Sequence, residues 1–248
     1  MLIQWNIRGY KSNYCDLIGL LKEHSPMCVV IQETMLGFKN PIAPNGYTMK
    51  CYSPVAQPTP GSGLAILAHR SAAFTSIALN TTFQAMACRV GLEELITVCN
   101  IYINPKNIIT QHDLELLIDQ LPPPFLILGD FNTKHRMWGN NAVDDRGRVI
   151  EQLLLNNDIN LLNTGEATHF HSATNSSTAI DLSISSPAIY PSLQWKPLSD
   201  LFGSDHYPII ISKLDAHPGT REANFIFKKA NWPQFKARTL IVTNPQNF

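Results

Sequence analysis

The sequence predicts an α/β protein in which two packed β-sheets carry helices on their outer faces. Three observations support this fold class. The first half of the chain alternates apolar segments typical of strands with segments that have helical spacing. The second half is mostly strand-like. Hydrophobic residues make up 44% of the 248 residues and charged residues only 15%, so the chain can bury a substantial core.

The strands and helices expected up to residue 158 alternate along the chain. Short apolar runs bounded by polar residues or glycine predict strands at 2–7, 27–33, 61–69, 83–91, 95–103 and 125–130. Leucines at helical spacing predict a helix over 13–24, with Ser12 or Asn13 as its N-cap. Further helices are expected at 111–121, which three prolines end, and at 146–158. The short segment 92–94 between two strands predicts a hairpin.

The remainder of the chain is expected to add strands and then to change character. Strands are predicted at 159–163, 179–186 and 206–212. We expect one domain over residues 1–214. From about Asp215 the sequence is basic and rich in proline and asparagine, which predicts a linker or docking tail over 215–248.

Composition excludes few functions by itself. The formal net charge is zero, which does not indicate nucleic-acid binding unless acidic residues cluster at a metal site. The five cysteines form no CxxC pair, so we expect a reducing compartment and no disulfide framework. Polar residues begin at Gln4, so no secretory signal is expected. No apolar run approaches the ~18–20 residues that a membrane-spanning helix needs.

Polar side chains close or interrupt six of the apolar segments. They are Asn6, Glu33, Tyr102, Asn104, Asp130, Asn132, Asp181, Ser204, Asp205 and His206. Any one of them alone is explained as an ordinary cap or turn residue. Asp181 differs, because an ionised carboxylate inside a β-branched run is costly unless it is paired or metal-bound. Carboxylates gathered at one sheet edge would repel each other, and a divalent cation such as Mg²⁺ would remove that penalty.

Other catalytic strategies have no signal in the sequence. No serine lies in a nucleophile-elbow context, and the cysteines show no activating neighbours. A GxxxxGKS loop is absent, so nucleoside triphosphates are not the expected substrates.

Six short motifs, in order, resemble the endonuclease/exonuclease/phosphatase superfamily, which includes DNase I. They are "QWNIRG", "VVIQET", "NIYI", "GDFN", "AIDLSI" and "SDHYPI", and they span residues 3 to about 213. The resemblance implies a four-layered α/β sandwich with two mainly antiparallel sheets. The stretches "GDFNTKHRMWGN" and "DRGRVIEQLLLNNDINLLNTGEATHF" are similar, more narrowly, to the endonuclease domain of non-LTR (LINE-type) retrotransposons. The chain would then be an excised domain with an added Met1.

The resemblance implies a metal and a water-activating side of the site. Glu33 would be the principal metal ligand, assisted by Asn6 directly or through water. Asp130 would orient or deprotonate the attacking water. Asn132 and Tyr102 would contact the scissile phosphate.

The same resemblance implies an imidazole side. His206 would bind a phosphate oxygen, and Asp181 would hold its imidazole in the productive tautomer. Asp205 would support the metal or the base. Thr168 and Ser204 would supply supporting hydrogen bonds close to the substrate.

Further residues are expected to meet DNA. Asp130 and Asn132 are two apart on what we expect to be an extended chain, so both would lie on one face while Phe131 enters the core. The following loop offers cations to flanking phosphates, with a solvated loop as the alternative; they are Lys134, His135, Arg136, Arg146 and Arg148. Trp138 is expected to be a core anchor. The segment 169–178, with His169 and His171, matches a hairpin that enters the minor groove in this family, and its alternative is a plain surface hairpin.

The expected function is a DNA endonuclease that uses Mg²⁺, or Mn²⁺ as a substitute. It would nick double-stranded chromosomal DNA in the nucleus and leave a 3′-hydroxyl that primes reverse transcription. The implied partners are the element RNA and a reverse transcriptase domain of the same polyprotein, with no membrane. The alternatives are an abasic-site repair endonuclease, a phosphoinositide-type phosphatase, or an inactive binding module. Arg8 stands where many abasic-site enzymes have an acid or amide, which counts against repair.

Overall fold

Two six-stranded β-sheets pack face to face in the computed structural model, which describes residues 1–39, 41–57 and 59–214. The first sheet has the order β13-β14-β1-β2-β4-β3. Its strands are β1 (Leu2–Asn6), β2 (Cys28–Gln32), β3 (Tyr47–Tyr52), β4 (Leu64–His69), β13 (Leu193–Pro197) and β14 (Ile209–Lys213).

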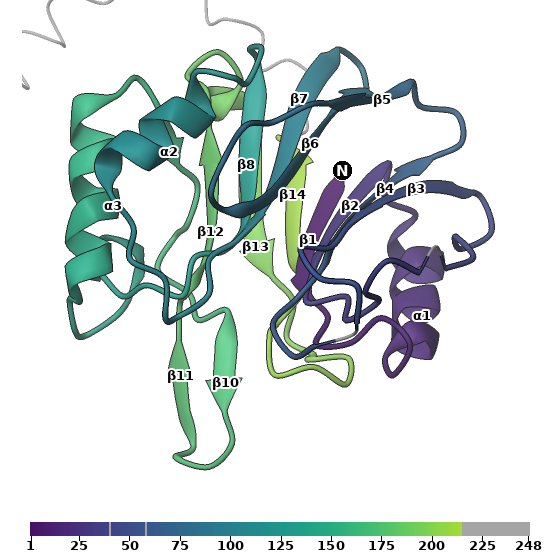
Figure 1. The fold of residues 1–248 in the computed structure, drawn as a ribbon, viewed down its shortest axis with the longest axis horizontal. Coiled ribbons are helices and arrows are strands. Elements are labelled where there is room, and N and C mark those ends of the chain that lie inside the picture. The colour runs from purple at the N-terminus through teal and green to yellow at the C-terminus, as the bar shows by residue number, and fades with distance from the viewer. Residues whose placement is uncertain (40, 58, 215–248) are drawn as a thin grey trace, which may run out of the picture. The chain divides into compact units, whose positions relative to one another are not determined.

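The second sheet has the order β5-β6-β7-β8-β12-β9. Its strands are β5 (Phe74–Ile77), β6 (Gln84–Gly91), β7 (Leu95–Tyr102), β8 (Phe125–Asp130), β9 (Asn160–Leu161) and β12 (Asp181–Ser185). A separate hairpin of β10 (His169–His171) and β11 (Ser176–Thr178) projects from the body (Figure 1).

Within the described residues, three α-helices cover the outer faces of the sheets. Helix α1 (Tyr14–His24) lies on the first sheet, whereas α2 (Gln111–Ile118) and α3 (Asp145–Asn156) lie on the second (Figure 1). Short 3-10 turns form η1 (Arg136–Trp138) and η2 (Tyr190–Ser192). The layers are therefore helix, sheet, sheet and helices, which confirms the predicted sandwich with helices outside.

The hydrophobic core follows these four layers. One cluster of buried side chains lies between the two sheets and includes Val30, Ile66, Val98 and Leu128. A second packs α2 and α3 on the second sheet, and a third packs Leu17, Leu20 and Leu21 of α1 on the first. Phe131 and Trp138 are both fully buried, which confirms them as core residues.

Some of the local predictions were wrong. Asn13 is the N-cap residue of α1, but its side chain does not cap the helix and instead donates to the backbone oxygen of Ile7 at 2.7 Å. The strand predicted at 159–163 is reduced to the two residues of β9. Strands β3, β5 and β13 were not predicted, because their half-exposed sequences carry little apolar signal.

The sheets are mixed rather than purely antiparallel. Strands β1 and β2 are parallel, as are β7 and β8, while the other pairs are antiparallel. The 92–94 connection between β6 and β7 is the predicted hairpin.

Residues Met1–Leu214 form one compact unit. The predicted linker over 215–248 lies outside the described residues. All five cysteines are free. None of the helices in the described part of the chain is both long and apolar enough to cross a bilayer.

Candidate active site

Six strand ends meet at one edge of the sandwich. Asn6, Tyr102 and Asp130 are the last residues of β1, β7 and β8, and Glu33 directly follows β2. Because β1 runs parallel to β2 and β7 parallel to β8, these carboxyl ends share an edge within each sheet. Strands β12 and β14 run antiparallel to β8 and β1, so their amino ends bring Asp181 and His206 to the same edge. The hairpin β10–β11 extends beyond this edge (Figure 1).

The amide of Asn6 links two carboxylates that come from different sheets. Its Nδ2 donates to Glu33 Oε1 at 3.2 Å and to Asp130 Oδ2 at 3.0 Å. Its Oδ1 accepts the backbone N–H of Arg8 at 3.1 Å, which fixes the amide orientation. Asn6 therefore holds the two predicted key acids close together.

An imidazole–carboxylate pair lies opposite these acids. His206 Nδ1 and Asp181 Oδ2 are 2.8 Å apart, and both side chains are buried, at 6% and 1% exposure. His206 Nε2 lies 3.9 Å from Asp130 Oδ2. The structure thus brings Asn6, Glu33, Asp130, Asp181 and His206 into one connected group.

Burial and the neighbouring charges act together on the pKa values of Asp130 and His206, and both pKa values are raised. Burial and the Asp181 carboxylate raise the pKa of Asp130 to about 7, against lowering by His206 and by the hydrogen bonds from Asn132 and Asn6. Burial alone would lower the pKa of His206, but Asp181, Asp130 and Asp205 together raise it to about 9. His206 is therefore an imidazolium at neutral pH, while Asp130 titrates close to it.

Tyr102 lies next to the acids as a protonated phenol. Burial, followed by the Glu33 and Asp130 carboxylates, raises its pKa far above the ordinary value. A phenol that keeps its proton is a hydrogen-bond donor at any physiological pH.

The turns after the site strands adopt uncommon backbone geometry. Arg8, Glu33 and Asn132 have φ values of 49°, 51° and 48°, in the left-handed region that non-glycine residues rarely adopt. The expected extended chain from Asp130 to Asn132 is therefore wrong: the backbone N–H of Asn132 turns back and donates to Asp130 Oδ1 at 2.9 Å. Asn132 Nδ2 donates to the backbone oxygen of Ile103 at 3.3 Å.

Gly129, directly before Asp130, has a steric reason to be glycine. A Cβ at this position would lie 1.8 Å from the backbone oxygen of Ile101 on the neighbouring β7. The motif "GDFN" therefore combines a close approach of two strands with the residues that face the site.

Thr168 and Ser204 support the site from behind. The fully buried Thr168 hydroxyl accepts the backbone N–H groups of Ile180 and Asp181, both at 3.1 Å. Ser204 donates to the backbone oxygen of Asn6 at 2.7 Å and accepts the N–H of His206 at 3.2 Å. These hydrogen bonds agree with the supporting role expected of both residues, and the fully buried Thr168 hydroxyl is directed at protein groups rather than at a substrate.

Asp205 lies on the His206 side, where it pairs with Arg8. Arg8 Nη1 is 2.6 Å from Asp205 Oδ2, and His169 Nε2 is 3.9 Å from the same oxygen. Within the described residues, no hydrogen bond or ion pair joins Asp205 to Glu33 or Asn6. The position of Asp205 thus favours an association with the imidazoles over one with Glu33.

The predicted cations of the next loop divide into exposed and structural residues. Lys134, Arg136 and Arg148 are exposed. His135 is buried, accepts the N–H of Met137 at Nδ1 and places Nε2 3.5 Å from Glu151, so its predicted contact with phosphate is wrong. Arg146 is likewise bound to protein.

The Arg146 guanidinium donates to the backbone oxygens of Asn104, Ile103 and Phe131 at 3.2, 3.4 and 2.8 Å. These bonds hold the half-buried Arg146 side chain against the protein instead of leaving it extended on the surface, as the expected contact with DNA would require. Asn104 also turns away from the site, with Oδ1 accepting the N–H of Lys106 at 2.9 Å.

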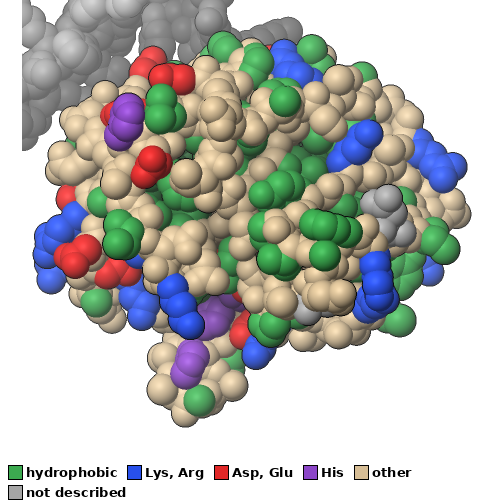
Figure 2. All heavy atoms as spheres, viewed as in Figure 1, with side chains coloured by type: hydrophobic (Ala, Val, Ile, Leu, Met, Phe, Trp, Pro, Cys, Tyr) green, Lys and Arg blue, Asp and Glu red, His purple; other side chains and the backbone are tan. Residues whose placement is uncertain are grey.

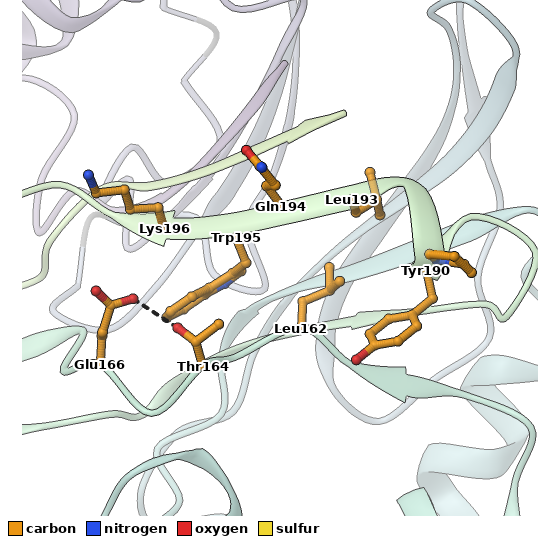
Figure 3. Close-up of a pocket in the computed structure, with 9 residues that line it drawn as sticks. Leu162, Thr164, Glu166, Tyr190, Leu193, Gln194, Trp195 and Lys196 are labelled. Atoms are coloured by element: carbon orange, nitrogen blue, oxygen red, sulfur yellow. Dashed lines mark hydrogen bonds between the residues drawn. The ribbon is translucent and has the colours of Figure 1, made fainter. Parts of the chain in front are cut away.

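A cavity of about 440 Å³ lies between the hairpin and the loop after β8. Four predicted site residues line it, namely Asn132, Lys134, His169 and His171. Figure 2 shows histidine side chains at the base of the projecting hairpin and on it, with an acidic side chain beside them. A larger groove of about 710 Å³ lies elsewhere, between the segment after β9 and strand β13, and none of the predicted site residues lines it (Figure 3).

Sequence reasoning missed a layer of buried amides directly below the site. Gln4 donates to the backbone oxygen of Gly129 at 3.0 Å and accepts from Ser183 at 2.8 Å, so it ties β1 to β8 and β12. Gln32 donates to Asn100 at 2.6 Å, which ties β2 to β7. The sequence did contain a signal for these residues: an amide inside an otherwise apolar strand is expected to be buried and therefore to need a hydrogen-bond partner.

The donor set suits a divalent cation. Glu33 and Asp130 share one amide, and no lysine or arginine of the described residues forms an ion pair with either. Asp181 Oδ1 is buried without a hydrogen-bond partner in the same part of the chain. Uncompensated carboxylate oxygens of this kind are the ligands that hard cations prefer.

Comparisons with solved structures agree with this architecture. The endonuclease domain of TRAS1, a telomere-specific non-LTR retrotransposon, superposes with a TM-score of 0.70 at 20% identity, covering 86% of this chain and 96% of that one. A 3′-5′ exonuclease from Neisseria meningitidis superposes with a TM-score of 0.68 at 17% identity, covering 86% and 98%. The fold is therefore the predicted DNase I-like fold.

Sequence comparisons point to one branch of this class. A family model described as endonuclease-reverse transcriptase matches residues 96–210. The RNA-directed DNA polymerase from mobile element jockey of Drosophila melanogaster is 27% identical over 214 residues, which cover 83% of this chain and 23% of that protein. The probable RNA-directed DNA polymerase from transposon X-element of the same species is 23% identical over 222 residues, covering 87% and 24%. The matched region thus spans about a quarter of the length of these relatives.

The fold is that of the DNase I-like endonuclease/exonuclease/phosphatase class. Within it, the resemblance predicted from the sequence is confirmed. The chain is similar to endonuclease domains of the non-LTR retrotransposon type.

Proposed function

We propose that this domain is a Mg²⁺-dependent endonuclease that nicks one strand of double-stranded DNA by hydrolysing a phosphodiester. The observation that carries the proposal is the Asn6 amide, which holds Glu33 and Asp130 together across the two sheets, opposite the His206–Asp181 pair. The scissile phosphate is proposed to bind against both the acids and the imidazolium.

Asp130 is the proposed proton acceptor for the attacking water. A general base works best when its pKa lies near the working pH, and the pKa of Asp130 is raised to about 7. Its Oδ1 is already held by the N–H of Asn132, which fixes the carboxylate orientation.

His206 and Tyr102 are the proposed donors to the phosphate. His206 carries positive charge at neutral pH, and Asp181 orients it through Nδ1 so that Nε2 is left for a phosphate oxygen. Tyr102 keeps its phenolic proton and can donate a second hydrogen bond. Asn132, at the cavity wall, is proposed as a further donor.

Glu33, assisted by Asn6, would hold the cation, which would neutralise charge on a non-bridging oxygen and on the leaving 3′ oxygen. Mg²⁺ is the proposed ion because the donors are hard carboxylate and amide oxygens, and Mn²⁺ is expected to substitute.

Lys134 and Arg136 are proposed to contact flanking phosphates, and the 169–178 hairpin to select the cut position. Both cations are exposed, and Lys134 shares the 440 Å³ cavity with His169 and His171 of the hairpin. Phosphate contacts of this kind position the enzyme without specifying a sequence.

The proposed biological role follows from the relatives, which are RNA-directed DNA polymerases of mobile elements. A nick that leaves a 3′-hydroxyl would prime reverse transcription of the element RNA by a polymerase domain of the same polyprotein. The proposed activity would act in the nucleus, with chromosomal DNA as the proposed target.

The test is relaxation of supercoiled plasmid with Mg²⁺, comparing the wild-type chain with Asp130→Ala and His206→Ala. Exposed Asp158, in the turn after α3, supplies the matched control Asp158→Ala. We expect losses of at least ~10²–10³-fold for the two site variants and none for the control. Extension of the nicks by a DNA polymerase would demonstrate 3′-hydroxyl ends.

Equal nicking by wild type and His206→Ala would refute the proposal. Release of phosphate from a soluble inositol phosphate, without plasmid nicking, would instead identify a phosphatase. Cleavage confined to DNA with abasic sites would identify a repair enzyme.

A further inference from the structure

Two histidines lie opposite each other on two paired backbone segments at the base of the hairpin. His169, the first residue of β10, forms an isolated antiparallel bridge with His206. The hydrogen bonds flank this pair, from Phe170 N to Asp205 O and from Tyr207 N to Thr168 O, both at 2.8 Å. His169 and His206 are therefore a non-hydrogen-bonded antiparallel pair, the geometry in which facing side chains approach most closely.

The two imidazoles are within reach of a common ion. Their ring centroids are 4.6 Å apart, with an interplanar angle of 59°. The pairing of the backbone segments sets this separation, so the rings do not depend on a flexible loop to meet.

Asp205 supplies a third donor beside the imidazoles. His169 Nε2 lies 3.9 Å from Asp205 Oδ2, and His206 Nε2 lies 4.0 Å from Asp205 Oδ1. One donor atom from each residue lies within 4.8 Å of the others. Zn²⁺ holds nitrogen and oxygen ligands at ~2.0–2.2 Å, so small side-chain rotations would close the group round one ion.

His206 already has the arrangement typical of a zinc ligand. Its Nδ1 is paired with the Asp181 carboxylate at 2.8 Å, while Nε2 makes no hydrogen bond within the described residues. The side chain is 6% exposed and directs Nε2 toward the group. A carboxylate that holds the far nitrogen of a metal-bound imidazole is a recurrent feature of zinc sites.

We propose that His169, Asp205 and His206 form a transition-metal site, with Zn²⁺ as the expected ion, distinct from the Mg²⁺ position at Glu33. Two imidazoles and one carboxylate favour Zn²⁺, whereas Mg²⁺ prefers oxygen ligands. Occupation of the site withdraws His206 Nε2 from the phosphate and inhibits cleavage. The metal site is inferred from the geometry of the three residues alone, whereas its inhibitory effect rests on the proposed nuclease function.

Zn²⁺ replaces any proton carried on the two Nε2 atoms, and these protons pass to solvent without any change in covalent bonds. Burial and the neighbouring His206 lower the pKa of His169, so its imidazole is predominantly neutral at neutral pH. His206 releases one proton when it binds the ion.

Arg8 competes with the metal ion for the Asp205 carboxylate. Its guanidinium pairs with Asp205 at 2.6 Å, but the Arg8 side chain is 60% exposed and can leave for solvent. Removing Arg8 frees the carboxylate and is expected to tighten Zn²⁺ binding several-fold.

The binding experiment titrates Zn²⁺ into the 248-residue chain in excess Mg²⁺ by calorimetry, with Co²⁺ absorption as a second probe of ligand geometry. His169→Gln is compared with His171→Gln, which removes a histidine two residues along the same strand. We expect one Zn²⁺ per wild-type chain, at least ~10-fold weaker binding for His169→Gln, and unchanged binding for His171→Gln. Circular dichroism confirms that each variant is folded.

Several outcomes would overturn the assignment. Zn²⁺ binding that is indifferent to His169→Gln excludes the site. Equal weakening by His171→Gln would locate the ion on the two hairpin histidines instead. Weaker binding in Arg8→Ala would contradict the competition.

A separate measurement tests inhibition. Zn²⁺ should reduce plasmid nicking by the wild-type chain in excess Mg²⁺, and His169→Gln should need at least ~10-fold more Zn²⁺ to lose half of its own Zn²⁺-free rate. An active chain that binds Zn²⁺ without inhibition would overturn the inhibitory role. A chain that binds Zn²⁺ but never nicks would overturn the proposed function while leaving the metal site intact.

Discussion

Replacing Asp181 by asparagine should change the charge of His206 and the stability of the fold together. The carboxylate is buried, and its Oδ2 is 2.8 Å from His206 Nδ1. Asparagine keeps the size of the side chain and removes its charge. The amide can also donate to Nδ1, which would favour the opposite imidazole tautomer.

The magnitude follows from the pKa of His206. Burial lowers this pKa, and Asp181 is the largest of the carboxylates that raise it from 6.5 to about 9. Without Asp181 the pKa should fall to 6.5 or below. The lost shift corresponds to ~3 kcal/mol of stability, an order-of-magnitude figure.

The sign of the pH dependence is set by the raised pKa. A histidine that binds its proton more tightly in the folded state stabilises the fold fully below its unfolded pKa. This contribution disappears as the pH rises from 6.5 through about 9. The stability gap between wild type and Asp181→Asn should therefore be largest below pH 6.5 and shrink above it.

Three measurements test this reasoning, with Asp158→Asn as the control. On the metal-free chain, NMR titration gives the pKa of the His206 imidazole, and urea denaturation at several pH values gives the free energy of unfolding. Plasmid relaxation in the presence of Mg²⁺ gives the nicking rate. We expect nicking to fall by ~10²–10⁴-fold. An unchanged pKa of His206 in Asp181→Asn would refute the electrostatic account of the pair.

Three further predictions address other parts of the site. Asp130→Asn should abolish nicking. The same variant should stabilise the metal-free chain by about 1–3 kcal/mol above pH ~7, because the raised pKa of Asp130 means that its ionisation opposes folding. A lower free energy of unfolding than that of wild type, measured by urea denaturation at alkaline pH, would contradict this. Arg146→Met should lower the free energy of unfolding by ~1–3 kcal/mol in urea denaturation, because three backbone carbonyls lose their donor. The control Arg148→Met, at an exposed position on the same helix, should lower it by under ~0.5 kcal/mol. Equal losses in the two variants would argue against a stabilising role of the Arg146 hydrogen bonds. Exchanging residues 169–178 for an unrelated hairpin should move cut positions in sequenced nicks more than it lowers the rate, and an identical cut pattern would eliminate the hairpin as a selector.

Much of the fold could be predicted because its central strands are buried on both faces. Segments such as those of β2, β4 and β8 read as continuous apolar runs, and the leucines of α1 have clear helical spacing. Edge strands such as β3 and β13 bury fewer side chains and leave a weaker pattern. Their pairing is decided by neighbours far away in the sequence.

The site could be predicted as a set of residues but not as a set of contacts. Polar residues at the ends of apolar strands identified Glu33, Asp130 and His206. Nothing local to the sequence indicates that Asn6 bonds both acids, or that Asn132 turns into a left-handed conformation. The cations show the same limit, since Arg146 and Arg148 are alike in the sequence and only the first is bound to carbonyls.

The sequence by itself determined which residues are buried and which chemistry the chain carries, because hydrophobic periodicity and side-chain type are local properties. Only the tertiary structure decided the pairing of His169 with His206, the ion pair of Arg8 with Asp205, and the pKa values of Asp130 and His206. These properties depend on burial and on distances between segments up to about 200 residues apart in the chain. His206, for example, faces groups that strands of both sheets bring to one edge.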